Sequence, residues 1–209
     1  MLRKFLWLLL LLFAVVTPVT IYAKNHRKDL GVTPTALNGA LYTELWSDTP
    51  IYAQGDLLNG VACAPTAVSM VLGHYNATSN LPDPTPSAFI NMVGEQNVIA
   101  GEGMPFSSMV PALHQLGYTN VSGQINTTLE QLNAALTNGP VIITTGVSFA
   151  TGQLEPGSAS HALVVVGATT DDSMVMVQDP FQQMRESVPK SEFVTMWANG
   201  QDGMFVVRP

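Results

Sequence analysis

The periodicity of the hydrophobic residues changes near residue 140, and this change constrains the possible fold. Most apolar residues before that point recur at helical spacing, whereas those after it form short β-branched runs separated by turns. Because the helices mostly precede the strands, we expect an α+β fold with two packed subdomains rather than alternating βαβ units. Helices are expected at residues 65–75, 87–93, 106–116, 127–139 and 191–199, strands at 141–145, 161–167, 174–178 and 204–207, and a short strand or helix at 41–46.

The helix expected at residues 127–139 carries recognisable signals at both ends. Thr127 followed by Glu130 fits a capping box, in which the N-cap hydroxyl and the later carboxylate satisfy reciprocal backbone N–H groups. Asn138 and Gly139 provide a C-terminal stop. The sequence therefore predicts Thr127 as the N-cap.

The N-terminus has the layout of a secretory signal. Arg3 and Lys4 form a short basic region, an unbroken apolar run follows from Phe5 to Val16, and a small residue stands at Ala23. We expect residues 1–23 to be a signal peptide, residues 24–40 a linker or arm, and residues 41–209 the folded domain. The protein is then exported, to the medium or an extracytoplasmic compartment. An uncleaved signal anchor that tethers the chain to a membrane is the alternative.

Cys63 is the only cysteine of the chain. Exported proteins normally pair their cysteines in disulfides, so a single thiol calls for another role. Pro65 is tolerated in the first turn of a helix, and an apolar helical pattern follows it, which places Cys63 at a helix N-terminus. The partial positive charge there lowers the pKa of a thiol and favours the nucleophilic thiolate. The alternative is a small buried hydrophobic residue.

A cysteine nucleophile needs a base, and His161 is the best candidate. His26 lies in the expected arm, and His114 lies on an expected helix. His74 follows Cys63 on the same helix at a separation of about 16 Å, which is too far for proton transfer. His161 opens an apolar strand, where one side of the imidazole could face a cleft. The alternative is a strand-end histidine that binds a local backbone group.

Asp179 is the candidate for orienting the imidazole. The runs at residues 161–167 and 174–178 are joined by a polar turn and predict an antiparallel hairpin. In that hairpin His161 begins one strand and Asp179 ends the other, so their side chains are neighbours. The alternative is a turn residue that precedes Pro180.

The ordered set Gln54, Cys63-Ala64-Pro65-Thr66, His161-Ala162-Leu163 and Asp179-Pro180 resembles the papain-like cysteine peptidases of the bacteriocin-processing, double-glycine type. The similarity is strongest to the stand-alone, exported branch of that family and covers about residues 51–180. It implies a papain-like fold in which the nucleophile helix packs on a C-terminal antiparallel sheet. It further implies Cys63 as nucleophile, His161 as base, Asp179 as orienting residue and Gln54 as oxyanion donor. Without the resemblance, Gln54 reads equally as a loop residue.

The resemblance implies a thiol hydrolase that cleaves peptide or protein amide bonds. Two positions depart from the family pattern, because Ala64 and Ser160 stand where glycine is usual. These departures leave two alternatives open: a binding module with little turnover, and an acyl transferase that uses the same triad.

Charge and composition exclude several partners. The net charge is −7, and no Lys or Arg occurs between Lys28 and Arg185. Binding to nucleic acid or to an anionic membrane requires cations, so we expect neither partner, and no stable membrane association once the signal is removed. No His, Cys, Asp or Glu cluster has the spacing of a metal site, and we expect no metal or other cofactor.

Overall fold

The computed structural model describes residues 42–43, 45–79, 81–82, 84–147, 159–169 and 171–209. The expected signal peptide and arm lie outside these ranges. All described residues belong to one unit, residues 38–209. Within this part of the chain, no helix combines the length and the apolar character needed to cross a membrane.

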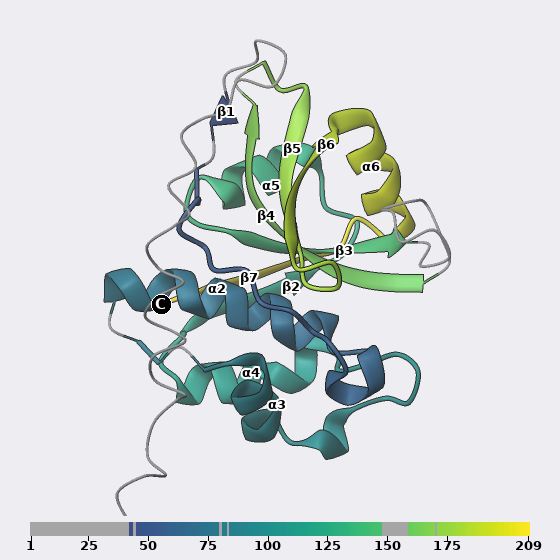
Figure 1. Cartoon of the computed structure of the whole chain (residues 1–209). Coiled ribbons are helices and arrows are strands. Elements are labelled where there is room, and N and C mark those ends of the chain that lie inside the picture. The colour runs from purple at the N-terminus through teal and green to yellow at the C-terminus, as the bar shows by residue number, and fades with distance from the viewer. Residues whose placement is uncertain (1–41, 44, 80, 83, 148–158, 170) are drawn as a thin grey trace, which may run out of the picture. The chain divides into compact units, whose positions relative to one another are not determined.

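The fold is α+β, with a seven-stranded antiparallel sheet (Figure 1). The helices are α2 (Cys63–Ser79), α3 (Pro86–Val93), α4 (Phe106–Gln115), α5 (Leu129–Leu136) and α6 (Lys190–Asn199), with 3-10 turns η1 (Leu57–Gly60) and η2 (Glu95–Asn97). The strands are β1 (Tyr42–Thr43), β2 (Asn120–Gln124), β3 (Val141–Val147), β4 (Ala159–Thr169), β5 (Met174–Asp179), β6 (Met184–Pro189) and β7 (Met204–Arg208). The strand order is β2-β7-β3-β4-β5-β6, and β1 pairs with β4.

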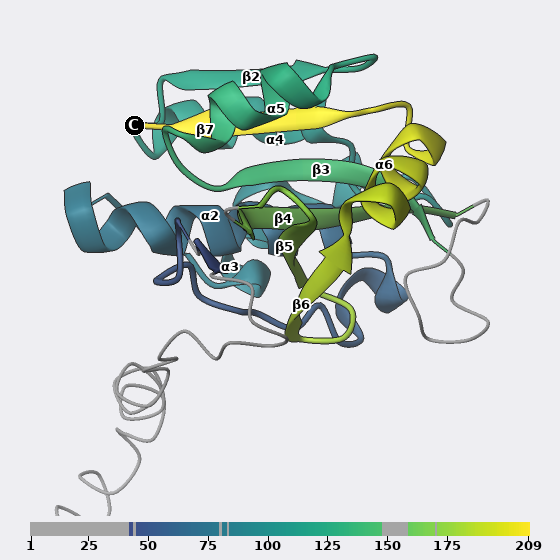
Figure 2. The same cartoon turned by 90° about the horizontal axis from the view of Figure 1, so that it is seen from above.

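Helices cover both faces of the sheet, because successive strand residues point to opposite sides. On β4, Val164 packs in a core with residues of α2, α3 and α4, whereas Leu163 packs in a second core with residues of α5 and α6. Figures 1 and 2 show α2 and α6 on opposite sides of β3 and β4. The expected packing of the helical half on a C-terminal sheet is confirmed, and α5 and α6 add a layer that the prediction did not contain.

Helix α2 is longer than its sequence pattern predicts. It begins at Cys63 rather than Pro65 and continues to Ser79 rather than ending near Tyr75. Residues 76–79 are polar, but they include no glycine or proline, so nothing in this turn interrupts the backbone hydrogen bonds. The position of Cys63 at the helix N-terminus is confirmed.

The capping box of α5 lies one residue later than predicted. Thr128, not Thr127, is the N-cap, and its hydroxyl accepts a hydrogen bond from the backbone N–H of Gln131. The Gln131 side chain accepts a hydrogen bond from the Thr128 N–H in return. The hydroxyl of Thr127 instead donates to the carbonyl of Asp202 at 2.5 Å. Two adjacent threonines were each compatible with the motif, and this tertiary contact distinguishes them.

Arg208, on β7, is a buried cation that caps the end of α5. Its guanidinium donates to four backbone carbonyls, those of Ala135, Gly139, Pro140 and Val207, at 2.8 to 3.1 Å. It also lies 5.7 Å from the centroid of the Tyr75 ring. Burial lowers the pKa of Arg208, although Tyr75 acts in the opposite direction. The residue joins α2, α5 and β7.

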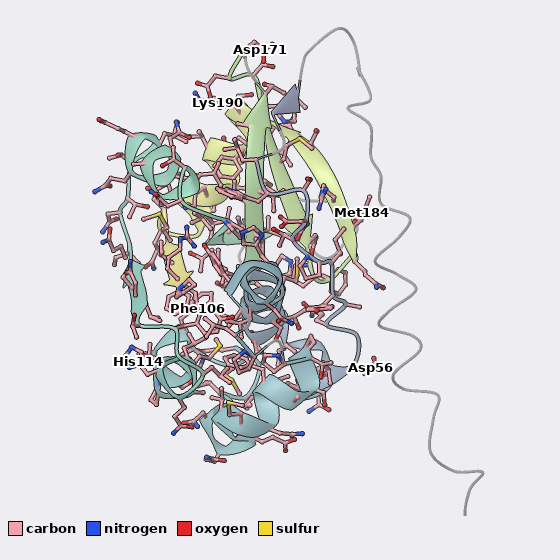
Figure 3. All side chains as sticks on the ribbon, turned by 90° about the vertical axis from the view of Figure 1, so that its left-hand side faces the viewer. Asp56, Phe106, His114, Asp171, Met184 and Lys190 are labelled. Atoms are coloured by element: carbon pink, nitrogen blue, oxygen red, sulfur yellow. The ribbon has the colours of Figure 1, made fainter. Side chains whose placement is uncertain are left out.

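We expect Arg208→Met to lower the free energy of unfolding by roughly 3 kcal/mol, because methionine keeps the apolar stem but leaves buried carbonyls without donors. The measurement is urea denaturation, with the effect seen in the midpoint at an unchanged m-value. The matched control is Lys190→Met. Lys190 lies at the surface (Figure 3). It pairs with Asp172, and loss of an exposed ion pair costs at most about 1 kcal/mol. Equal losses in the two variants would contradict the assigned role of Arg208.

Candidate active site

Cys63 stands at the tip of α2, where the helix meets the start of β4. Its side chain is half-buried and forms no disulfide. Residues Ser160, His161 and Ala162 of β4 line the same cleft as Cys63. The N–H groups of Ala162 and Ala64 donate to the sulfur. The thiol is therefore open to a ligand on one side and hydrogen-bonded on the other, unlike a cysteine sealed in a core.

The side chains of His161 and Asp179 form a buried pair. The distance from His161 Nε2 to Asp179 Oδ1 is 2.8 Å, and the residues are 2% and 1% exposed. The register of the predicted hairpin explains the contact: Val164 pairs with Gln178, so the same register places Asp179 opposite Leu163, two residues from His161 on the same strand face. The same Oδ1 accepts the backbone N–H of Phe181 at 2.7 Å, which holds the carboxylate in place.

The thiol of Cys63 hydrogen-bonds to His161, so the structure brings three of the four predicted residues into one chain of contacts. With Nε2 bound to Asp179, Nδ1 is the ring nitrogen that remains for the sulfur. A nucleophile, a base and an orienting group in this order are the arrangement that nucleophilic catalysis requires.

The two titrating groups stabilise each other's charged forms. Burial acts to raise the pKa of the Cys63 thiol, but the hydrogen bond and charge of His161, together with the N–H groups of Ala162 and Ala64, outweigh it and lower the pKa. Burial acts to lower the pKa of His161, but hydrogen bonds to Asp179 and Cys63 and their charges raise it to about 9. A lowered thiol pKa beside a raised imidazole pKa favours a thiolate–imidazolium pair.

Gln54 is near this group but does not line the cleft. It is 3% exposed, and its Nε2 donates to the carbonyl of Gly60 at 2.5 Å. A primary amide has two N–H groups, so one donor remains for another acceptor. Its Oε1 is buried and has no partner among the described residues. The backbone N–H of Gln54 binds the carbonyl of Pro180 at 2.9 Å, which joins this segment to the turn after Asp179.

The segment between Gln54 and Cys63 contains an unusual backbone. Leu58 and Asn59 have φ of 54° and 58°, a backbone region that residues other than glycine rarely adopt. Backbone strain of this kind collects at functional sites, where the surrounding structure maintains it. Here it lies in the loop whose Gly60 carbonyl receives the amide of Gln54.

The cleft beside Cys63 has a volume of about 230 Å³. One part of its lining is formed by Thr144 of β3 and the start of β4, and a second wall by residues 99 and 102–106. The sequence analysis missed the second wall. Its only local signal was the close pair Gly101 and Gly103. Gly103 has φ of 89°, and a Cβ there would lie 2.4 Å from the carbonyl oxygen of Val61, so the turn needs glycine to pack against the loop before Cys63.

Phe181 is another neighbour that the sequence analysis missed. Its ring lies edge-on to the His161 ring, with centroids 6.5 Å apart and planes at 87°. Phe181 is 47% exposed, so it covers part of the buried His161–Asp179 pair while remaining open to solvent. Its position directly after Asp179-Pro180 was the available signal.

The other histidines do not join the site. His74 Nδ1 lies 2.9 Å from Asp48 Oδ1 and its ring packs against Trp46, far along α2 from Cys63. His114 is exposed on α4 (Figure 3). His26 lies outside the described residues. Among the described residues, no group of three or more His, Cys, Asp and Glu side chains could hold a metal ion.

Comparisons with known proteins identify the family and the fold. The Peptidase_C39 like family matches residues 47–203, which is more than half of the chain. No curated protein matches. A structure described as a C39-like peptidase from Bacillus anthracis has a TM-score of 0.57 at 16% identity and covers 79% of this chain and 96% of that one. The Carica candamarcensis cysteine protease CMS1MS2, in complex with E-64, has a TM-score of 0.55 at 12% identity, covering 77% and 92%.

The peptidase domain of Streptococcus mutans ComA, in complex with a small-molecule inhibitor, has a TM-score of 0.40 at 18% identity and covers 59% of this chain and 89% of that domain. At such low identities the two structures with the higher TM-scores show the fold alone, which is that of papain-like cysteine peptidases. The family match supplies the stronger assignment. This chain belongs to the Peptidase_C39 like family and has a papain-like cysteine peptidase fold.

Proposed function

We propose that the protein is a cysteine peptidase that cleaves peptide or protein amide bonds. Cys63 is the nucleophile, His161 the base, Asp179 the orienting residue and Gln54 an oxyanion donor. The observation that carries the proposal is the 2.8 Å contact between buried His161 and Asp179, placed beside a thiol that faces an open cleft. Membership of the family and the papain-like fold agree with this assignment.

The reaction follows from the positions of these groups. The Cys63 thiolate attacks the carbonyl carbon of the scissile amide, and the oxyanion that forms is stabilised by the Cys63 N–H and, in this proposal, by the second N–H of the Gln54 amide. His161 gives its proton to the nitrogen of the leaving amine as the C–N bond breaks. His161 then takes a proton from water, which attacks the thioester and releases the acid. Asp179 keeps the imidazole oriented and stabilises its charged form.

The test is hydrolysis of a casein-derived peptide mixture by the domain, followed by mass spectrometry, with and without an epoxide inhibitor that alkylates thiols. We expect new peptide termini without the inhibitor and none with it. Adding a primary amine separates the acyl-transfer alternative, because amide products in place of acids would show transfer to the amine. Selective alkylation of Cys63 with no cleavage of any peptide would instead support a binding module and contradict the proposal.

We also propose export, with residues 1–23 as a cleaved signal peptide, residues 24–40 as an arm and residues 41–209 as the folded domain. The basic and apolar N-terminal regions support this division. The intact mass of protein recovered outside the cytoplasm should correspond to a chain that starts at Lys24. A full-length mass in the membrane fraction would support the tethered alternative.

A further inference from the structure

Among the residues that the structure describes, Glu102 is the one carboxylate that lines the cleft beside Cys63, and no described Lys or Arg lines it. Glu102 is exposed, and no salt bridge involving it occurs among the described residues. A side chain that forms a wall of the cleft with its charge unpaired is available to a ligand. The cleft therefore has a negative charge on the wall formed by residues 99 and 102–106.

The turn that carries Glu102 is held in place by its own backbone. The N–H groups of Ile99, Glu102 and Gly103 form hydrogen bonds of 2.8 to 3.0 Å across the turn from Ile99 to Gly103. Gly103 packs directly against the carbonyl of Val61, two residues before Cys63. The carboxylate is thus attached to a wall whose position relative to the nucleophile is fixed.

Apolar side chains line the cleft together with Glu102, among them Ile99 and Phe106. Ile99 is 47% exposed, and Phe106 is half-buried, with its ring stacked on Phe205 at 4.5 Å. An apolar surface next to a carboxylate suits lysine and arginine, which pack an alkyl stem along apolar groups and keep a charged head at the end. A purely apolar substrate side chain would leave the Glu102 carboxylate without a partner, and an acidic one would be repelled by it.

We propose that Glu102 selects substrates that carry a lysine or arginine next to the scissile bond. The ammonium or guanidinium group pairs with the Glu102 carboxylate, while the stem lies on Ile99 and Phe106. This inference rests on the proposed peptidase function and adds the class of side chain that the cleft accepts. Glu102 acts on substrate selection and takes no part in bond cleavage.

The composition of the chain is consistent with this preference. No Lys or Arg occurs between Lys28 and Arg185, a stretch that includes both walls of the cleft and most of the described domain. A peptidase that requires a basic side chain finds no matching bond in that stretch of its own chain. The same absence means that no Lys or Arg of the chain lies close to Glu102 in sequence.

The test uses matched fluorogenic peptides that carry Lys, Arg, Gln or Glu at one position on either side of the scissile bond. We expect kcat/KM for the best Lys or Arg peptide to exceed that of its Gln counterpart by about fivefold, the size of effect given by a partly exposed ion pair. Glu102→Gln should remove the preference, and 1 M salt should weaken it in the wild type. The control is Glu95→Gln, since Glu95 is exposed nearby but does not line the cleft.

A preference that survives in Glu102→Gln, or cleavage with no preference for basic peptides, would overturn the inference while leaving the peptidase proposal intact. If no peptide is cleaved, the alkylation rate of Cys63 is compared for peptidyl epoxides that carry Arg or Gln. Labelling that is faster with the Arg epoxide than with the Gln epoxide in the wild type, but not in Glu102→Gln, would support the role of Glu102. Equal labelling, or no labelling at all, would overturn it, and the lack of cleavage in each of these cases would contradict the proposed peptidase function.

Discussion

Cys63→Ala should lower kcat/KM for peptide hydrolysis by at least about 10⁴-fold, since removal of a nucleophile leaves only the contribution of binding and oxyanion stabilisation. The substitution removes one half-buried sulfur at the start of α2, so the fold should be retained. The measurement is kcat/KM on a peptide substrate, with a thermal unfolding curve to verify that the variant is folded.

Ala64→Gly is the matched control for Cys63→Ala, because it changes the adjacent residue and restores the glycine that is usual in the family. Ala64 lies in the first turn of α2, where the change removes one methyl group from the cleft lining and costs the helix about 1 kcal/mol at most. We expect this variant to keep its activity. If Cys63→Ala cleaves peptides as fast as the wild type, the thiol mechanism is wrong.

Asp179→Asn should reduce kcat/KM by about 100-fold or more and change its dependence on pH. In the wild type the active thiolate–imidazolium pair exists above the pKa of Cys63 and below that of His161, which is about 9. Activity should therefore fall on the alkaline side near pH 9. Without the negative charge of Asp179, the imidazolium loses its proton at a lower pH, so the alkaline limb moves to lower pH. On the acidic side the imidazole is still protonated in this variant, so the thiol keeps its charged partner and the acidic limb should stay close to that of the wild type.

The pH dependence of kcat/KM and that of Cys63 alkylation both report the narrower pH range in which the thiolate–imidazolium pair exists. Alkylation reports it without turnover. Asp171→Asn is the control, because Asp171 sits at the opposite end of the β4–β5 hairpin (Figure 3) and binds only local groups, Thr169 and Ser173. Its profile should match that of the wild type. Superimposable profiles for Asp179→Asn and the wild type would show that Asp179 does not tune His161.

The sequence predicted the parts of the site that depend on local pattern. Pro65 and the apolar run after it placed Cys63 at a helix tip, and the two β-branched runs around a polar turn placed His161 next to Asp179. Both deductions need only short-range rules: the tolerance of proline in a first turn, and the pairing of strands across a hairpin. The signals are strong because the helix and the strands are buried and therefore apolar.

Elements that depend on tertiary contacts were missed. Strand β2 has the polar sequence Asn-Val-Ser-Gly-Gln and lies at an edge of the sheet, so it lacks the apolar alternation of a buried strand. Strand β6 is at the other edge and is similarly polar. The strand at 204–207, predicted to close the sheet, lies between β2 and β3, because β2 supplies the edge beyond it. The cleft wall at residues 99–106 was missed because its position depends on packing of Gly103 against Val61.

The nucleophile and its base belong to different layers of the molecule. Cys63 is carried by α2, whereas His161 and Asp179 are carried by β4 and β5, and Ala162, Val164 and Val166 of β4 pack in the core that contains α2. The alignment of the hydrogen bond between the Cys63 sulfur and the His161 imidazole therefore depends on this apolar contact between α2 and the sheet. A slight sliding of α2 over the sheet would separate the two groups before any secondary structure melts. On warming, the protein should consequently lose the proposed peptidase activity before it loses its helical content.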